Sequence, residues 1–95
     1  MPAETDAGKA LDLIAKDAGK PGQNWAKAHE IVQAREGEPI FDAIHALLHR
    51  IEGDAANAAY WDRRAGTDFG KYGTEDELSA LRDFAARQGA IPSAT

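Results

Sequence analysis

The sequence predicts an all-α fold, a small bundle of about five helices in a single domain that covers residues 1–95. Alanine is the leading apolar residue in a chain that is 43% hydrophobic and 28% charged, a composition that favours helices over strands. Apolar residues also recur at spacings of three and four, as they do on one face of a helix. A chain of 95 residues has room for one core and for no second domain.

Two consecutive segments of the chain have nearly the same pattern. Residues 25–38 can be laid over residues 41–54 without a gap. In each segment an aromatic residue is followed four residues later by a histidine (His29 and His45), and a Glu-Gly-acid triplet ends the segment. Glycine after a helical pattern is a common helix stop, so the two segments predict two similar helices that form a hairpin.

Start and stop signals divide the chain into individual helices. Thr5 is suited to cap the first helix, and Gly19 is suited to end it. Pro39 suits the first position of the third helix, where its missing N–H is no loss. Gly53 ends that helix and Asp54 caps the next one. Three of the predicted helices span residues 6–18, 39–52 and 55–65. The second helix is expected to follow Gly22 or Asn24 and to reach Arg35 or Glu36, and the last to open at residues 74–77 and to end at Gly89. The ends at 1–5 and 92–95 are expected to fray.

Local patterns also assign roles to individual side chains. Thr74 and Glu77 have the spacing of a capping box, in which the two side chains bond backbone N–H groups at the start of the last helix. The large apolar residues at helical spacing predict a core that includes Trp25, Val32, Ile44, Leu48, Ile51 and Trp61.

A polar stripe runs beside the apolar face of the helix over 39–52. With about 100° between successive residues, side chains at spacings of three and four share one flank of a helix, at the border between core and solvent. On this helix the flank consists of Asp42, His45, His49 and Glu52. On the preceding helix it consists of His29, Gln33 and Glu36.

The hairpin brings the histidines to one height. If the two helices pack antiparallel about the turn at 37–39, His29 lies level with the stretch between His45 and His49. One hand of the hairpin turns the two polar flanks toward each other, and the other hand sends them to opposite edges. The sequence does not decide between the two hands.

The three histidines can be interpreted as a metal site or as structural residues. If the flanks meet, the side chains of His29, His45, His49 and Glu52 offer three imidazoles and a carboxylate to Zn²⁺ or Fe²⁺, with an open coordination position. The helical His-Glu-x-x-His pattern of metalloproteases is absent. In the structural interpretation, each ring packs on apolar surface and gives its N–H to a carboxylate or a carbonyl.

A third interpretation is a site for a small polar ligand or for proton transfer. Its binding residues would be His29, Gln33, His45, His49 and Glu52, with Tyr60 or Arg64 reaching in from the helix over 55–65. The charged residues Arg50, Glu52 and Arg64 near the helix junction either lock the hairpin together or bind an anion.

Two stretches of the chain resemble known proteins. Residues 53–66 resemble the second helix of a tetratricopeptide repeat, with Ala58 and Ala65 seven residues apart, and residues 39–52 would be the partner helix. Where that repeat carries leucine and an aromatic residue, this chain has His45 and His49. The string from His45 to Gly66 is also similar to a set of short, functionally uncharacterised bacterial proteins, a resemblance that implies a shared domain and no activity.

Composition limits the class of function. The net charge of −5 argues against binding to nucleic acid or to an anionic membrane, and the absence of cysteine excludes disulfides and thiolate metal sites. The N-terminus lacks the pattern of a signal peptide, so we expect a cytoplasmic protein.

Two hypotheses of function follow. One is a non-enzymatic binding or protein-interaction module with a histidine-rich polar groove, and the limited core leaves room for a homodimer. The other is a metal-dependent or acid–base enzyme that uses the same histidines. A bound metal, or a concave pocket that gathers His29 with His45 and His49, would favour the enzyme. Flanks dispersed to opposite edges, or an exposed apolar patch beside them, would favour the interaction module.

Overall fold

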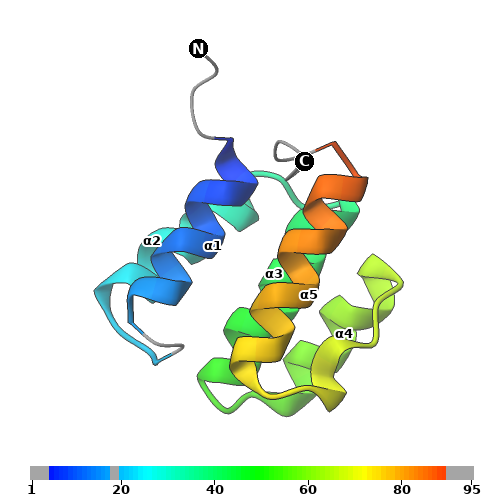
Figure 1. Cartoon of the computed structure of the whole chain (residues 1–95). Helices are drawn as coiled ribbons and strands as arrows, with labels where there is room; N and C mark the ends of the chain where they lie inside the picture. Colours follow the sequence, from blue (N-terminus) through cyan, green and yellow to red (C-terminus); the bar gives the residue numbers. More distant parts are fainter. Residues whose placement is uncertain (1–4, 18–19, 90–95) are drawn as a thin grey trace.

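All regular structure in the described residues is helical. The computed structural model describes residues 5–17 and 20–89, and Figure 1 shows the helices in chain order. They are α1 (Asp6–Lys16), α2 (Gln23–Gln33), α3 (Pro39–Ile51), α4 (Ala55–Ala65), the short 3₁₀ helix η1 (Phe69–Lys71) and α5 (Thr74–Arg87). The predicted all-α fold is therefore confirmed. Within the described ranges, no helix is both long enough and apolar enough to cross a bilayer.

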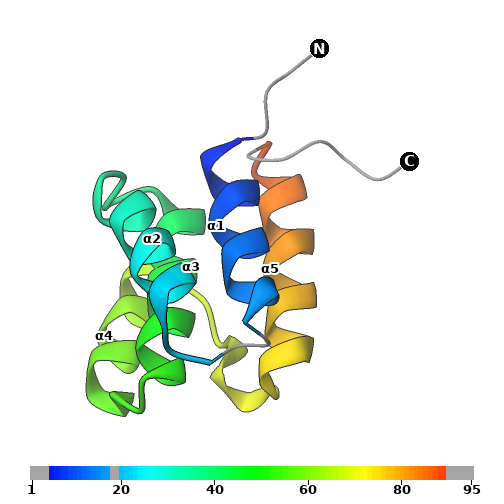
Figure 2. The ribbon, with the colours of Figure 1, turned by 90° about the vertical axis from the view of Figure 1, so that its left-hand side faces the viewer.

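Helix α3 lies at the centre of the molecule. Every residue from Ile40 to His49 is buried, on all sides of the helix. The other four α-helices all contact α3. Figure 2 shows two layers, with α2, α3 and α4 on one side and with α1 and α5 on the other. A helix that is covered all round places its polar side chains inside the protein, which decides the environment of two histidines.

The core forms where α1, α2 and α5 meet α3. Among the predicted core residues, Val32, Ile44, Leu48 and Trp61 are buried. Trp25 and Ile51 are partly buried and pack against the same cluster. The largest fully buried apolar side chains are Leu11, Val32, Ile44, Leu47, Leu48 and Leu81. Each such side chain contributes about 1.5–3 kcal/mol relative to an exposed one.

Most predicted helix ends are confirmed. The Thr5 hydroxyl accepts a hydrogen bond from the Gly8 N–H at 3.1 Å, and the Asp54 carboxylate accepts one from the Asn57 N–H at 3.2 Å. Pro39 is the first residue of α3. Gly53 has φ +88°, the left-handed conformation that stops a helix at little cost only in glycine. Helix α1 ends at Lys16, and the stop predicted at Gly19 lies outside the described residues.

The capping box predicted at the start of α5 is wrong. Thr74 is the first residue inside the helix, Gly73 occupies the cap position, and no side chain makes a capping hydrogen bond there. Glu77 is 1% exposed and bonds Arg50 of α3 instead. A buried guanidinium offers a carboxylate a stronger interaction than a backbone N–H does, so the tertiary contact prevails over the local motif.

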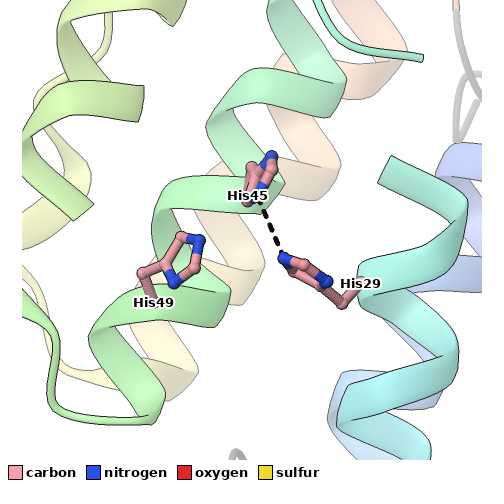
Figure 3. A group of neighbouring side chains, drawn as sticks. All are labelled: His29, His45 and His49. Atoms are coloured by element: carbon pink, nitrogen blue, oxygen red, sulfur yellow. Dashed lines mark hydrogen bonds between the residues drawn. The ribbon is translucent and has the colours of Figure 1, made fainter. Parts of the chain in front are cut away.

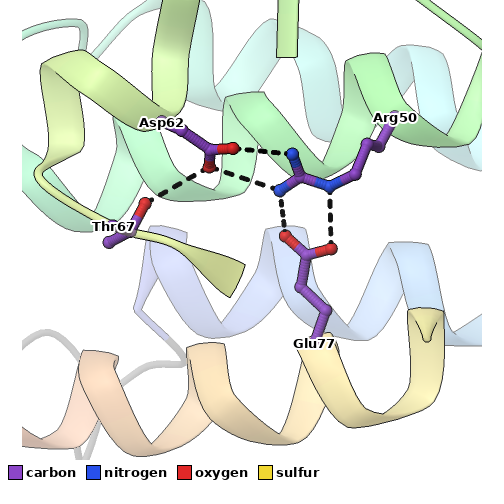
Figure 4. Close-up of polar contacts among 4 residues, drawn as sticks. All are labelled: Arg50, Asp62, Thr67 and Glu77. Atoms are coloured by element: carbon purple, nitrogen blue, oxygen red, sulfur yellow. Dashed lines mark hydrogen bonds and ion pairs between the residues drawn. The ribbon is translucent and has the colours of Figure 1, made fainter. Parts of the chain in front are cut away.

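A partly buried ionic cluster joins three helices, and we call Arg50, Asp62 and Glu77 the arginine cluster. Arg50 Nη1 lies 2.7 Å from Asp62 Oδ2, and Arg50 Nε lies 3.0 Å from Glu77 Oε1 (Figure 4). The hydroxyl of Thr67 donates to Asp62 at 3.3 Å. A Cβ atom on Gly70 would lie 2.9 Å from Arg50 Nη1, so glycine is needed for the close approach of this loop. Both carboxylates and the guanidinium are satisfied, which fixes α4 and α5 on α3.

Candidate functional site: a three-histidine cluster

The three histidines of the chain lie together, and we call His29, His45 and His49 the histidine cluster. His29 comes from α2, and the other two come from successive turns of α3 (Figure 3). His29 Nε2 lies 3.1 Å from His45 Nε2, and one ring nitrogen of each histidine lies within 4.8 Å of the other two. The hairpin therefore has the hand that turns the histidine-bearing flanks toward each other.

Two tryptophans hold the rings of the histidine cluster. The ring of Trp25 stacks on His29 with centroids 4.9 Å apart, and its indole N–H donates to the Leu48 carbonyl at 2.7 Å. Trp61 stacks on His45 with centroids 3.9 Å apart. Stacking fixes the planes of both imidazoles and covers them with apolar surface. The tryptophans thus belong to the site as well as to the core.

The spacing of the residues in the sequence predicts both tryptophan–histidine contacts, although the residue types alone indicate only core positions for the tryptophans. Trp25 precedes His29 by one helical turn, so the two rings share a face of α2. Trp61 and His45 are equally far along the chain from Gly53, where the α3–α4 hairpin turns, so they lie level. Treating the tryptophans only as core residues hid their place beside the histidines.

Three of the four residues on the polar flank of α3 are buried rather than at the border with solvent, and the fourth, Glu52, is exposed. Asp42 is 1% exposed, His45 is 3% exposed and His49 is 7% exposed, whereas His29 on α2 is half-buried. The cause is that α3 is covered on all sides, which the hydrophobic pattern of α3 alone does not reveal. Burial puts two of the three imidazoles in a low-dielectric environment and leaves one with access to solvent.

Two of the three histidines, His29 and His45, are held in the neutral form. Burial, followed by the charges of His29, His49 and Arg64, lowers the pKa of His45 to about 4. Burial also lowers the pKa of His29, the effect of His49 adds to this, and the carboxylates of Glu52 and Glu36 oppose it. A neutral imidazole has a free lone pair, which is the form that binds a metal ion or accepts a proton.

One buried nitrogen of the cluster has no hydrogen-bond partner among the described residues. His29 Nε2 and His45 Nε2 share one hydrogen bond, in which either ring can be the donor. Nδ1 of His45 is buried without a hydrogen bond. In one tautomer this nitrogen is a buried donor and in the other a buried acceptor, and an unpaired buried polar group costs about 1–3 kcal/mol in either case. The cluster is therefore not arranged for the highest stability.

Glu52 acts on His49 rather than facing the other two histidines. Its Oε2 lies 2.6 Å from His49 Nδ1, one turn further along the flank. This contact leaves His49 Nε2 for the interior of the cluster. A carboxylate on the second nitrogen of an imidazole fixes its tautomer and orientation and makes the first nitrogen a stronger ligand. Glu52, expected from the sequence as a direct metal ligand, thus occupies a supporting position.

The remaining predicted binding residues lie around the cluster to different extents. Gln33 is exposed at the end of α2. Tyr60 is 43% exposed and its hydroxyl accepts a hydrogen bond from Arg64 at 3.1 Å. The Arg64 guanidinium lies over the Trp61 ring, 5.0 Å from its centroid. Arg64 is therefore connected to the cluster through Trp61, whereas no contact connects Gln33 to it in the described part of the chain.

Within residues 5–17 and 20–89, a second group of candidate ligands adjoins the first. His49, Glu52 and Asp54 also offer atoms within 4.8 Å of one another, but both carboxylates are exposed. The Asp54 carboxylate already caps α4, and Glu52 already bonds His49. The histidine cluster is therefore the better candidate, because two of its three imidazoles are buried and its ring nitrogens lie close to one another.

Comparisons of the chain with known protein families, with curated protein sequences and with solved structures each gave no match. The resemblance to a tetratricopeptide unit and the similarity of residues 45–66 to short bacterial proteins stay predictions from the sequence.

Proposed function

We propose that this domain binds a divalent transition metal ion, Zn²⁺ or Fe²⁺, through the Nε2 atoms of His29, His45 and His49. Three imidazoles and an exchangeable fourth ligand are the donor set of open zinc sites. Glu52 would hold the His49 ring in place. The domain would then act through the open position of the metal, where water or another ligand exchanges.

The observation that carries the proposal is the 3.1 Å separation of His29 Nε2 and His45 Nε2. Zn–N bonds are about 2.0–2.1 Å long, so two nitrogens bound to one ion in a tetrahedral site stand roughly 3.3 Å apart. The pair is already close to this separation. His49 offers a third nitrogen within 4.8 Å of both, a gap that a side-chain rotation closes.

A purely structural role explains the cluster less well. A histidine kept for stability normally bonds a carboxylate or a carbonyl with its N–H. His45 instead bonds another imidazole and leaves Nδ1 unpaired within the described residues. An arrangement that lowers stability and gathers three imidazoles is typical of a functional site. Dispersed flanks would have favoured the interaction module, whereas the histidines of the two flanks lie together.

The test is calorimetric titration of the purified, chelator-treated protein with Zn²⁺, together with elemental analysis of the untreated protein. We expect one ion per chain and loss of binding in His29→Ala. His29 is the safest position to truncate because it is half-buried and lies at the edge of the core. The chain contains three histidines and no cysteine, so a strong site elsewhere has no comparable ligands.

Asp54→Asn is the matched control. Asparagine caps a helix about as well as aspartate, so α4 keeps its N-cap while the exposed ligand group loses a carboxylate. Zinc affinity unchanged in Asp54→Asn and lost in His29→Ala supports the proposal. The reverse pattern would move the metal to His49, Glu52 and Asp54. Absence of binding in the wild-type protein would refute metal binding altogether.

A further inference from the structure

Most N–H groups of the Arg64 guanidinium have no hydrogen-bond partner among the described residues. Its one hydrogen bond among the described residues goes to the Tyr60 hydroxyl, and its Nε lies 3.9 Å from Asp42 Oδ2, beyond hydrogen-bond distance. The Asp42 carboxylate is buried and already accepts the Gly37 N–H at 3.0 Å. A guanidinium carries five N–H donors, so most of those on Arg64 are available. Its side chain is 40% exposed and therefore accessible to a ligand.

Arg50 provides the contrast within the same chain. Its side chain is 22% exposed, and its three nitrogens all bond the carboxylates of Asp62 and Glu77. From the sequence, Arg50 and Arg64 are both candidates for either of two roles, locking the hairpin together or binding an anion. The two roles are divided: Arg50 locks the helices, and Arg64, which forms a long ion pair with Asp42, keeps most of its N–H groups for a further anion.

Arg64 stands on the side of α4 that faces the histidine cluster. Its guanidinium lies over Trp61, and Trp61 stacks on His45. Burial is the main cause of the low pKa of His45, and Arg64 is one of the charges that add to it. The Glu36 carboxylate acts electrostatically on both Arg64 and His29. Arg64 therefore lies beside the histidine cluster, in contact with the tryptophan that stacks on His45.

We propose that the exchangeable ligand of the metal is a small oxyanion, held at the open coordination position by one oxygen and by Arg64 through a second. This inference rests on the proposed metal site and names the class of its ligand. Carboxylates and phosphates present two oxygens to the planar fork of an arginine, and an anionic oxygen is also a good ligand for Zn²⁺ or Fe²⁺. Tyr60 holds the guanidinium in position and, being exposed, borders the entry to the site.

The experiment uses the full chain loaded with Co²⁺, whose visible spectrum reports its ligands. Acetate, malonate and inorganic phosphate are titrated into wild type, Arg64→Gln and Arg64→Lys. Arg63→Gln is the matched control, because it removes the same charge from the neighbouring exposed position. We expect malonate or phosphate to change the wild-type spectrum, with at least tenfold weaker binding in Arg64→Gln. We expect a partial recovery in Arg64→Lys and no change in Arg63→Gln.

The outcomes separate this inference from the proposed function. Equal anion affinity in Arg64→Gln and Arg63→Gln, with Co²⁺ still bound, overturns the role of Arg64 and leaves the metal site standing. A wild-type spectrum that no anion changes also overturns it. Failure of Co²⁺ to bind the wild-type protein refutes both proposals. A preference for phosphate over malonate, or the reverse, identifies the kind of oxyanion once Arg64 dependence is established.

Discussion

The arginine cluster and the histidine cluster lie on the same central helix but differ in how well their polar atoms are paired. In the arginine cluster the charges of Arg50, Asp62 and Glu77 balance within hydrogen-bond distance. In the histidine cluster, imidazole rings face one another and His45 Nδ1 has no partner among the described residues. The first arrangement is typical of a structural contact, and the second is typical of a site that awaits a ligand.

Burial alone therefore does not distinguish a structural cluster from a functional one. Glu77 is 1% exposed and His45 is 3% exposed, yet only Glu77 is fully compensated by opposite charge. A buried charge without a partner is strongly unfavourable, so Arg50 and Glu77 depend on each other. A buried neutral imidazole with one unpaired nitrogen is tolerated at a smaller cost. Variants that separate stability from metal binding test the distinction.

The largest expected effect is on stability, from Glu77→Ala. Removing this carboxylate leaves the Arg50 guanidinium partly buried without one of its partners, and we expect the free energy of unfolding to fall by about 3–5 kcal/mol. Chemical denaturation measures the change. Glu75→Ala, an exposed change in the same turn of α5, should stay within about 0.5 kcal/mol of wild type. A loss below about 1 kcal/mol for Glu77→Ala would contradict the structural role of the arginine cluster.

The next largest expected effect is the pH dependence of the free energy of unfolding of the metal-free protein. The pKa of His45 is near 4 in the folded state and 6.5 is its ordinary value, so between these values the unfolded chain binds a proton that the folded protein does not. The stabilising contribution is complete above pH 6.5 and is lost as the pH falls toward 4, by about 1.4 kcal/mol per pH unit. Urea denaturation across this range measures the slope. A slope that stays the same in His45→Leu would show that other groups cause it.

A smaller effect, on metal affinity, is expected from Glu52→Gln. The carboxylate that bonds His49 Nδ1 at 2.6 Å is lost, and loss of such a supporting partner typically weakens metal binding about 10–100-fold. Zinc titration of the chelator-treated protein gives the ratio. Glu36→Gln removes an exposed carboxylate that acts on His29 only through its charge. If both variants weaken binding equally, Glu52 contributes charge and not orientation.

The smallest expected effect is a gain in stability rather than a loss, and it comes from His45→Leu. His45→Leu replaces a buried ring that has an unpaired nitrogen by an apolar side chain, which should raise the stability of the metal-free protein by about 1 kcal/mol. The same variant should lose metal binding. Thermal denaturation with and without Zn²⁺ measures both properties. A clear loss of metal-free stability would indicate that His45 is kept for packing against Trp61.

Much of the fold could be predicted from local sequence because it depends on local interactions. Helix periods, the Thr5 and Asp54 caps and the Gly53 stop are set by residues a few positions apart. The common height of the three histidines followed from the length of the helices about their turn. These features need no knowledge of distant contacts.

The rest depends on contacts between distant segments. The hand of the α2–α3 hairpin is fixed by how the other helices cover α3, and no single helix encodes it. Glu77 is 27 residues from Arg50, so a capping motif was the only local interpretation of that glutamate. The burial of His45 and His49 depends on α3 being enclosed, which includes the packing of Trp61 on His45. Residue types pointed to the site, but its environment is tertiary.

X-ray absorption at the zinc edge tests most directly whether the histidine cluster is a metal site. The protein loaded with one equivalent of Zn²⁺ should show three imidazole nitrogens at about 2.0–2.1 Å, with the outer-shell scattering of the rings and one further oxygen. In His29→Ala the imidazole contribution should fall. A spectrum with oxygen ligands alone, or one unchanged in His29→Ala, would contradict binding by the three histidines.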